Sequence, residues 1–261
     1  MSATTTMPTP ALVLDLDRFD ANVVAIVALA AQHGIAFAPH AKTHRIPQLG
    51  MRQLALGAAR LTVAKLGEAE GFADAGAPAV FVAFPVVGEQ VAERALALHR
   101  RIDLRLGVDS IVGAEALGRV FAAAGTAARV LLAVDTGLGR EGVAPADAPP
   151  IAAAIAALDG IELMGVFTHE GHAYGATDAV DLVARSRRAA ETMVDVADRI
   201  RASGAGCPVV SLGCSASVAA VVVVPGVTEV RPGIASFGDA GLFARGCTPT
   251  STSPSACSRR W

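Results

Sequence analysis

Short apolar segments alternate with stretches of helical periodicity along most of this chain. Each apolar segment has the length and the β-branched content typical of a strand buried on both faces. Eight such segments are present: GIAFAP (34–39), ARLTVA (59–64), AVFVAFP (79–85), IDLRLGV (102–108), RVLLAVD (129–135), IELMGVFTH (161–169), CPVVSLG (207–213) and GVTEVRP (226–232). The pattern predicts a parallel sheet with both faces covered.

Ala- and Leu-rich stretches of helical period lie between these segments. The first helix is expected over DRFDANVVAIVALAAQHG, residues 17–34, with Asp17 as its N-cap and Gly34 as its stop. Further helices are expected over residues 46–57, 66–76, 88–100 and 179–204. Eight strands alternating with helices predict an α/β fold, a (β/α)8 TIM-type barrel. A doubly wound open sheet gives the same alternation and stays the structural alternative.

The last segment of the chain abandons this alternation. ARGCTPTSTSPSACSRRW, residues 244–261, is rich in Ser, Thr, Pro and Cys, so we expect a disordered tail there. The barrel domain is accordingly expected over residues 1–243. The abrupt change in composition leads to the hypothesis that the reading frame shifted near residue 245 and truncated a longer protein, which sequencing the gene would test.

Composition narrows the choice of partner. The chain is 52% hydrophobic with a formal net charge of −2, which gives no electrostatic footprint for nucleic acid or for an anionic membrane. We expect a small-molecule partner and leave open whether the protein forms a homodimer. Four cysteines at no recognised metal spacing fit a reducing cytosol. With no signal peptide read at the N-terminus and apolar runs too short to span a bilayer, a cytoplasmic protein is expected.

Polar and small residues follow the predicted strands at their carboxyl ends, where barrel enzymes build active sites. These residues are Lys42, Lys65, Asp109, DTGLGREG (135–142), THEGHAY (168–174), SLGCSAS (211–217) and RPG (231–233). The small residues Gly213 to Ser217, with Gly233 opposite, would offer backbone N–H groups to an anion. An ordinary flexible turn is the alternative interpretation of that loop.

One glycine motif imitates a dinucleotide site. Gly137, Gly139 and Gly142 match G-x-G-x-x-G, and Asp159 lies about 20 residues further on, as that fingerprint requires. The third glycine is followed by VAPADAPP, which delays the helix whose N-terminus would bind the pyrophosphate. We therefore set the dinucleotide interpretation aside.

Two histidine pairs invite a metal interpretation. His169 and His172 are three residues apart, and their segment is not H-E-x-x-H. His40 and His44 are four apart, but Pro39 makes a regular helix through both doubtful. For each pair a polar role inside a pocket is the preferred interpretation.

Lysine is scarce in this chain: Lys42 and Lys65 are the only two among 22 Lys and Arg residues. Arginine stays charged and cannot form an imine, whereas lysine can lose its proton in a partly apolar pocket and attack an aldehyde. An aldehyde cofactor with a phosphate handle would use both the lysine and the anion loop, and pyridoxal phosphate (PLP) is the obvious one. Lys65 remains the competitor of Lys42.

Six segments in order resemble the D-threonine aldolase and D-serine dehydratase family, which are fold-type III PLP enzymes related to alanine racemase. They are TPALVLDLDRFDANV, PHAKTHR, VAKLGEAEG, VDTGLGREGV, THEGHAY and TEVRPG, spread from about residue 8 to about residue 243. The resemblance implies an alanine racemase-like barrel with the cofactor imine on Lys42.

The resemblance also implies the remaining cofactor-binding residues. Arg140 would line the cofactor pocket and Tyr174 would stand near the ring. The phosphate would lie on Gly213, Cys214 and Ser215, with Gly233 near it, although the family usually has GSTPT where this chain has GCSAS. His40, His169 and Arg231 complete the expected set.

A larger departure concerns the family's β-rich C-terminal domain, which carries a metal-binding His with a Cys or Asp partner. That domain is expected to be missing here, so the divalent metal of the family has no ligands to carry over to this chain. We expect a chain that binds the cofactor and turns over poorly.

The function implied is a PLP-dependent lyase on D-3-hydroxy amino acids. Retro-aldol cleavage would give glycine and an aldehyde, whereas loss of the Cα proton and of the β-hydroxyl would lead to a 2-oxo acid. Two alternatives stay open: an amino-acid (alanine) racemase of the same fold, and a barrel that carries PLP without catalysis.

Overall fold

The computed structural model describes residues 10–238 and 257–260. Eight parallel strands form one sheet in the order β2-β9-β8-β7-β6-β5-β4-β3. Their bounds are β2 Ala36–Phe37, β3 Leu61–Val63, β4 Ala79–Pro85, β5 Asp103–Val108, β6 Ala128–Ala133, β7 Ile161–Thr168, β8 Val209–Leu212 and β9 Glu229–Val230. All eight predicted strands are present; seven lie inside their apolar segments, and β6 begins one residue before its segment, at Ala128.

The two ends of this sheet meet, which distinguishes a barrel from an open sheet. His40, just after β2, forms a parallel bridge with Thr62 of β3. Beside it, the Thr62 N–H donates to the Pro39 carbonyl over 2.9 Å and the Thr62 hydroxyl donates to the Ala38 carbonyl over 2.8 Å. The predicted (β/α)8 barrel is confirmed, and the doubly wound alternative is wrong.

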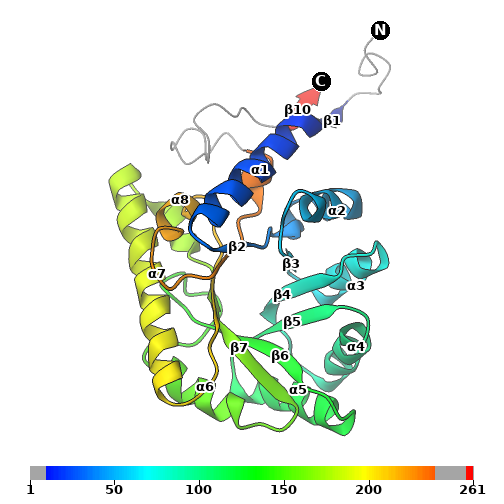
Figure 1. Cartoon of the computed structure of the whole chain (residues 1–261), viewed down its shortest axis with the longest axis vertical. Coiled ribbons are helices and arrows are strands. Elements are labelled where there is room, and N and C mark those ends of the chain that lie inside the picture. The colour runs from blue at the N-terminus through cyan, green and yellow to red at the C-terminus, as the bar shows by residue number, and fades with distance from the viewer. Residues whose placement is uncertain (1–9, 239–256, 261) are drawn as a thin grey trace.

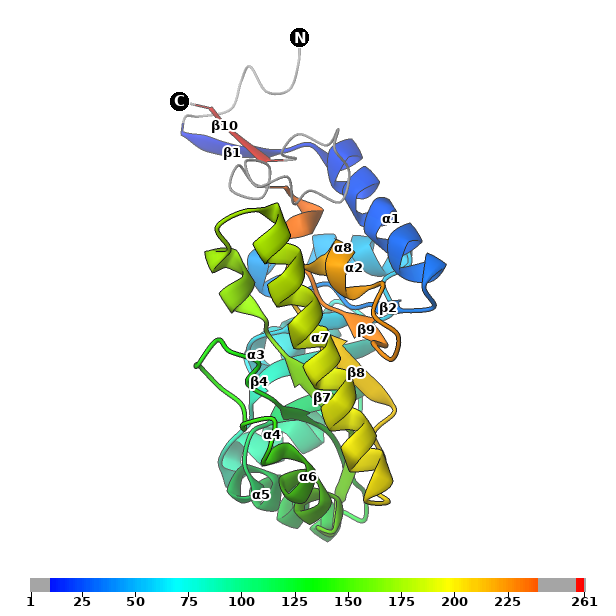
Figure 2. The same ribbon diagram turned by 90° about the vertical axis from the view of Figure 1, so that its left-hand side faces the viewer.

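Helices surround the barrel. Their bounds are α1 Leu16–Gln32, α2 Pro47–Ala55, α3 Leu66–Asp74, α4 Glu89–His99, α5 Ile111–Ala123, α6 Ala148–Ala156, α7 Ala179–Ala202 and α8 Val218–Val221. Figures 1 and 2 show α2 to α5 on one side and the long α7 on the opposite side. In the described part of the chain, no helix is both long enough and apolar enough to cross a membrane.

The sequence misplaced the start of α1. Its N-cap is Asp15, whose side chain accepts a hydrogen bond from the Arg18 N–H over 3.1 Å, so the prediction of Asp17 was wrong by two residues. Asp17 lies in the first turn instead, where its negative charge still complements the helix dipole. Gly34 follows the helix with a φ of +68°, which confirms it as the stop.

Two layers of apolar side chains hold the barrel together. Alternate residues of a strand point to opposite faces, so Val80 and Val82 pack outward against the helices while Phe81 between them points into the barrel. Inside, Phe81 meets the ring of Phe167 edge-on with centroids 5.1 Å apart. A Cβ on Gly107 would lie 2.9 Å from that Phe167 ring, so only glycine leaves room for it.

A small two-stranded ribbon lies beyond α1, at the end of the molecule away from α5 and α6 (Figures 1 and 2). The strands β1 (Ala11–Leu14) and β10 (Cys257–Arg260) are antiparallel. Within the tail expected to be disordered, residues 257–260 are thus a strand. Its other residues, 244–256 and 261, lie outside the described part, where disorder stays a prediction.

Candidate functional site

Lys42 lies in a short 3₁₀ turn, η2 (Ala41–Thr43), at the carboxyl end of β2. The turn cannot continue as a regular helix, and Arg45 beyond it has a φ of 54°, unusual for a residue with a side chain. Lys42 is exposed at the mouth of the barrel. Desolvation by the surrounding protein, followed by the charges of Arg140 and Arg231, lowers the pKa of Lys42 below its ordinary value. A larger fraction of its amine is therefore neutral near pH 7 than for an ordinary lysine.

Gly233, which follows β9, lies directly against the turn that carries Lys42. A Cβ on Gly233 would lie 2.5 Å from Thr43 Oγ1 and 2.7 Å from the His40 carbonyl oxygen. His40 Nδ1 is buried and has no hydrogen-bond partner among the described residues. Burial, then the charges of Lys42 and Arg231, holds the pKa of His40 well below its usual value, so its ring is neutral.

The loop Gly213–Ser217, which connects β8 to α8, is held by the segment after β7. His169 Nδ1 is hydrogen-bonded to the Gly213 carbonyl. Glu170 is completely buried and accepts hydrogen bonds from the Gly213 N–H over 3.1 Å and from the Ser217 hydroxyl over 2.5 Å. Burial lowers the pKa of His169, and the charges of Lys42 and Arg231 contribute to the same shift.

Tyr174 lies against the same loop, in the 3₁₀ turn η3 (Gly171–Gly175). Burial raises the pKa of Tyr174, and the neighbouring Cys214 adds to that shift, whereas hydrogen bonds with Ser215 oppose it. The Ser215 hydroxyl in turn accepts from the Ala235 N–H over 3.2 Å. The loop is thus fastened to the segment that contains Gly233.

Arg231 is buried inside the barrel, just below the mouth. Its guanidinium lies 5.5 Å from the Phe81 ring centroid and 5.4 Å from that of Phe167. It donates to the Thr168 carbonyl over 2.5 Å. A Cβ on Gly213 would lie 2.9 Å from Arg231 Nη2, so the guanidinium and the backbone of the loop are in direct contact.

The GLGREG segment forms a rigid loop rather than a dinucleotide site. The Asp135 carboxylate accepts hydrogen bonds from the N–H groups of Gly137, Leu138 and Gly139. Burial opposes ionisation of Asp135, but these hydrogen bonds outweigh it and lower its pKa. The next helix, α6, starts only at Ala148, which confirms that the motif does not open a helix.

Arg140, at the tip of this loop, supplies positive charge to the mouth. Its side chain is half exposed and is paired with Glu141, with 2.6 Å between Arg140 Nη2 and Glu141 Oε1. Both residues influence the pKa of Lys42, which places them near it.

Lys65 precedes α3 and is exposed, and Asp109 precedes Ser110, the N-cap of α5. Unlike Lys42, neither takes part in the contacts described above.

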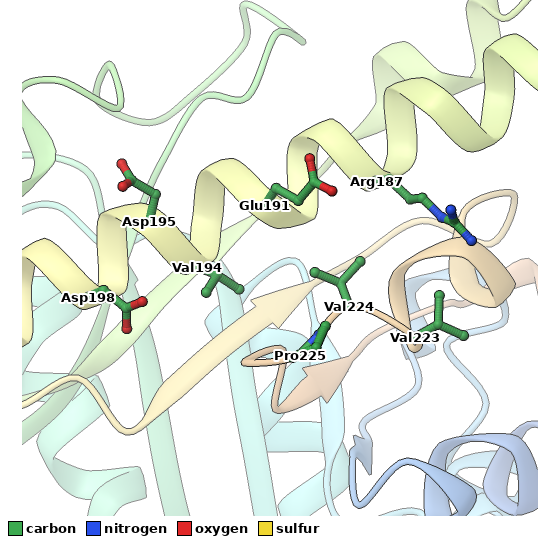
Figure 3. A pocket seen from close by; sticks show the side chains of 8 residues that line it. All are labelled: Arg187, Glu191, Val194, Asp195, Asp198, Val223, Val224 and Pro225. Carbon is green, nitrogen blue, oxygen red and sulfur yellow. The ribbon is translucent and has the colours of Figure 1, made fainter.

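Two hollows of the surface differ in their relation to this mouth. One hollow, of about 590 Å³, lies between α7 and the segment after α8 (Figure 3). Asp198 on its wall is already paired with Arg201 over 2.7 Å, and no residue of the mouth lines it. At the mouth itself a cavity of about 10 Å³ lies among residues of β6, β7 and the GLGREG loop. The chemistry of the side chains, not the size of the hollow, therefore identifies the candidate site.

The expected site residues come together at one mouth, with Lys42, His40 and Gly233 on one side and Gly213, Cys214, Ser215 and Tyr174 on the other. Sequence reasoning missed Glu170, because nothing in its neighbourhood along the chain marks it as buried. Its position directly after a predicted strand and beside His169 was the available signal. Within the described residues, no cluster of three or more His, Cys, Asp or Glu side chains could hold a metal ion.

Two curated relatives match most of this chain. The D-threo-3-hydroxyaspartate dehydratase of Delftia sp. (strain HT23) is 36% identical over 237 residues, which are 90% of this chain and 62% of that protein. The D-threonine aldolase of an Arthrobacter species is 33% identical over 233 residues, 88% of this chain and 61% of that protein. This chain thus spans about three fifths of the length of these relatives.

Solved structures show the same fold. The D-threonine aldolase of Filomicrobium marinum superposes with a TM-score of 0.87 at 33% identity, covering 91% of this chain and 64% of that one. The Delftia dehydratase gives a TM-score of 0.88 at 34% identity, covering 97% and 67%. The family model for the alanine racemase N-terminal domain matches residues 14–241. This chain therefore belongs to the alanine racemase N-terminal domain family.

Proposed function

We propose that this chain binds pyridoxal phosphate through Lys42 and serves as the cofactor-binding part of a lyase that acts on D-3-hydroxy amino acids. The observation that carries the proposal is the convergence of Lys42, Gly233 and the Gly213–Ser217 loop at one barrel mouth. The names of the dehydratase and aldolase relatives support the substrate class.

The residues present fit the cofactor. Gly213 and Gly233 have no Cβ, so Arg231 and the Lys42 turn pack directly against their backbone. This packing brings a guanidinium next to the Gly213–Ser217 loop, and a guanidinium is a strong partner for phosphate. The buried His40 Nδ1 has no hydrogen-bond partner among the described residues. Buried polar atoms usually have one, so a ligand bound at the mouth would supply the missing partner.

Lys42 would supply the nucleophile. A lysine attacks an aldehyde only in its neutral form, and the lowered pKa of Lys42 increases that form at neutral pH. When bound, the cofactor ring supplies the electron sink for negative charge at the Cα of an amino acid. When it is not bonded to the cofactor, the neutral Lys42 Nζ would be a base that can take a proton from the substrate Cα. Dehydration needs this step, and aldol cleavage does not.

The cations of the mouth would bind the substrate and hold it in place. Arg140 is half exposed and lies near Lys42, so a substrate carboxylate would meet its guanidinium first. Arg231 is buried, fixed by Thr168 and by two aromatic rings, and would hold its charge just below the mouth, against the loop that would receive the phosphate. His40 and His169, both neutral, would act there as hydrogen-bonding groups rather than as charges.

Borohydride reduction of the purified protein loaded with PLP, followed by peptide mapping, tests the attachment. Phosphopyridoxyl label is expected on Lys42. Lys42→Arg should abolish the label and Lys65→Arg should leave it unchanged. Label on Lys65, or no label on the wild-type chain, would contradict the proposal.

The reaction itself requires a product assay with D-threonine and D-threo-3-hydroxyaspartate. Aldehyde and glycine indicate aldol cleavage, a 2-oxo acid indicates dehydration, and an inverted enantiomer indicates racemisation. Labelled Lys42 without any of these products would support the carrier alternative instead of the lyase.

A further inference from the structure

Glu170 stands apart from the other acidic residues in the mouth. It is the second residue after β7, and it has no exposed surface. Burying a carboxylate is costly unless hydrogen bonds compensate for the lost water. In this chain both compensating donors come from a single loop, Gly213–Ser217.

The two hydrogen bonds of Glu170 fasten that loop at its first and last residues. Oε2 accepts from the Gly213 N–H over 3.1 Å, and Oε1 accepts from the Ser217 hydroxyl over 2.5 Å. The preceding residue, His169, is hydrogen-bonded through Nδ1 to the Gly213 carbonyl. Two consecutive residues therefore hold Gly213 by its N–H and by its carbonyl, and a single carboxylate sets the separation between the two ends of the loop.

The opposite side of the loop is equally constrained. Arg231 lies against Gly213, where a Cβ would come within 2.9 Å of Nη2. The Ser217 hydroxyl also lies 3.2 Å from the Cys214 carbonyl, which closes the loop on itself. Without Glu170, the buried Gly213 N–H would lose its acceptor, and the Ser217 hydroxyl would keep only its longer contact with the Cys214 carbonyl. The loop would then have to rearrange to find water or another partner for Gly213.

We propose that Glu170 is a positioning residue for phosphate: it never touches the ligand, but holds the Gly213–Ser217 loop in the shape that receives the phosphate group of the cofactor. The inference rests on the proposed function, since the phosphate in question is that of pyridoxal phosphate. Glu170 acts through hydrogen-bond geometry, and its negative charge is not itself the useful property.

The choice of substitution separates geometry from charge. In Glu170→Gln the amide oxygen can still accept from the Gly213 N–H, and the amide nitrogen can donate to the Ser217 oxygen, so both ends of the loop stay fastened without the charge. Glu170→Ala removes both anchors. Ser217→Ala removes one and leaves the Gly213 anchor in place.

The measurement compares two ligands on the full chain. Pyridoxal phosphate and pyridoxal carry the same aldehyde and ring, and only the first carries phosphate. Dissociation constants for both, from absorbance titration, give a ratio that isolates the phosphate contribution. Asp103→Ala is the matched control, because Asp103 pairs with Arg60 and Arg129 at the start of β5, the end of the barrel opposite the mouth.

Glu170→Ala is expected to reduce the preference for the phosphorylated ligand about tenfold or more, the loss that accompanies unsatisfied buried partners. Ser217→Ala should reduce it less, and Glu170→Gln and Asp103→Ala should keep it within about threefold of wild type. If Glu170→Ala proves insoluble, the Ser217→Ala and Glu170→Gln pair carries the same test.

The opposite results are equally clear. A wild-type preference that survives in Glu170→Ala overturns the positioning role, and so does a Glu170→Gln variant that loses as much as Glu170→Ala, or a Ser217→Ala variant that loses nothing. A wild-type chain with no preference for phosphate at all would instead contradict the proposed function.

Discussion

Ser211 and Glu229 form the buried polar centre of the barrel: the Ser211 hydroxyl donates to the Glu229 carboxylate over 2.6 Å. On the mouth side, Ser211 accepts from Arg231 Nε over 3.2 Å. On the far side, Glu229 accepts from Arg60 over 3.1 Å. A hydrogen-bonded row thus runs through the barrel from the far end to Arg231, and it fixes the guanidinium that lies under the loop.

Glu229→Ala is therefore expected to destabilise the protein by about 3–5 kcal/mol. Arg105, whose side chain is mostly buried, loses its ion pair with Glu229, and Arg60 keeps only Asp103. The buried Ser211 hydroxyl also loses its acceptor. Urea unfolding measures the change. Glu162→Ala serves as the control, since the Glu162 side chain is 52% exposed in its pair with Arg129 and should contribute less than about 1 kcal/mol. Equal decreases in the free energy of unfolding for the two variants would show that the buried hydrogen-bonded row stabilises the protein no more than an exposed ion pair does.

Gly233→Ala is expected to cost about 1–3 kcal/mol, since its methyl group would collide with the His40 carbonyl and with Thr43 and push the Lys42 turn away. The melting temperature and the rate of phosphopyridoxyl labelling should fall together. Gly175→Ala is the matched control, because a Cβ there meets nothing within 4 Å. A Gly233→Ala variant as stable and as reactive as Gly175→Ala would refute the close contact.

The reactivity of Lys42 should depend on Arg140. The Arg140 charge, after desolvation, lowers the pKa of Lys42, and removing it also leaves Glu141 free to favour the protonated amine. Arg140→Gln should therefore shift the midpoint of reductive methylation at Lys42 to higher pH, measured by mass spectrometry across a pH series. Arg129→Gln, at the far end of the barrel, should leave that midpoint in place. A midpoint that Arg140→Gln does not move would contradict the assigned cause.

Asp135 should control the order of the GLGREG loop. Asp135→Ala removes the acceptor of three backbone N–H groups, so the amides of Gly137, Leu138 and Gly139 should exchange with deuterium about tenfold faster or more. Asp74→Ala, which breaks an exposed pair with Arg101, should leave their exchange unchanged.

The same amides provide a pH test. The pKa of Asp135 is lowered in the folded protein, so its stabilisation is complete above the pKa of the unfolded chain and is lost as pH falls through the lower folded value. Protection, corrected for the intrinsic exchange rate, should persist down to about pH 4 and decline only below it. A decline that starts near neutral pH would show that another group is responsible.

The fold was predictable because strand and helix periodicities alternate without interruption, and the strands are too apolar to face water. The open-sheet alternative could be dismissed only in three dimensions, since closure depends on a few contacts of β3 and the residues just before it with residues 37–40. β1 was missed because its partner, β10, lies more than 240 residues away along the chain. The N-cap of α1 was misplaced because Asp15 and Asp17 have the same chemistry two residues apart.

The site was predictable in its ingredients and not in its supports. A scarce lysine and small residues after strands are visible in the sequence, so residue type alone reduced the lysine to Lys42 or Lys65 and named the Gly213–Ser217 loop. The family resemblance then singled out Lys42. Glu170 could not, because a buried acid and a surface acid look the same until its partners, 43 and 47 positions further along, are brought to it. Sequence shows which groups are available, whereas burial and hydrogen bonding decide what each one does.

The barrel is most weakly paired around β2, the strand that precedes Lys42. β2 and β9 pair over two residues each, and β2 meets β3 through a single bridge, whereas β6 and β7 pair over six. Local opening is easiest where hydrogen bonds are fewest, so the strands next to Lys42 would be the first to separate. A ligand that reaches from Lys42 to Gly213 crosses β9 and ties β2 to β8. Such a ligand would hold the most weakly paired strands together. Ligand binding would therefore stabilise the closed barrel, and opening of the barrel would weaken ligand binding.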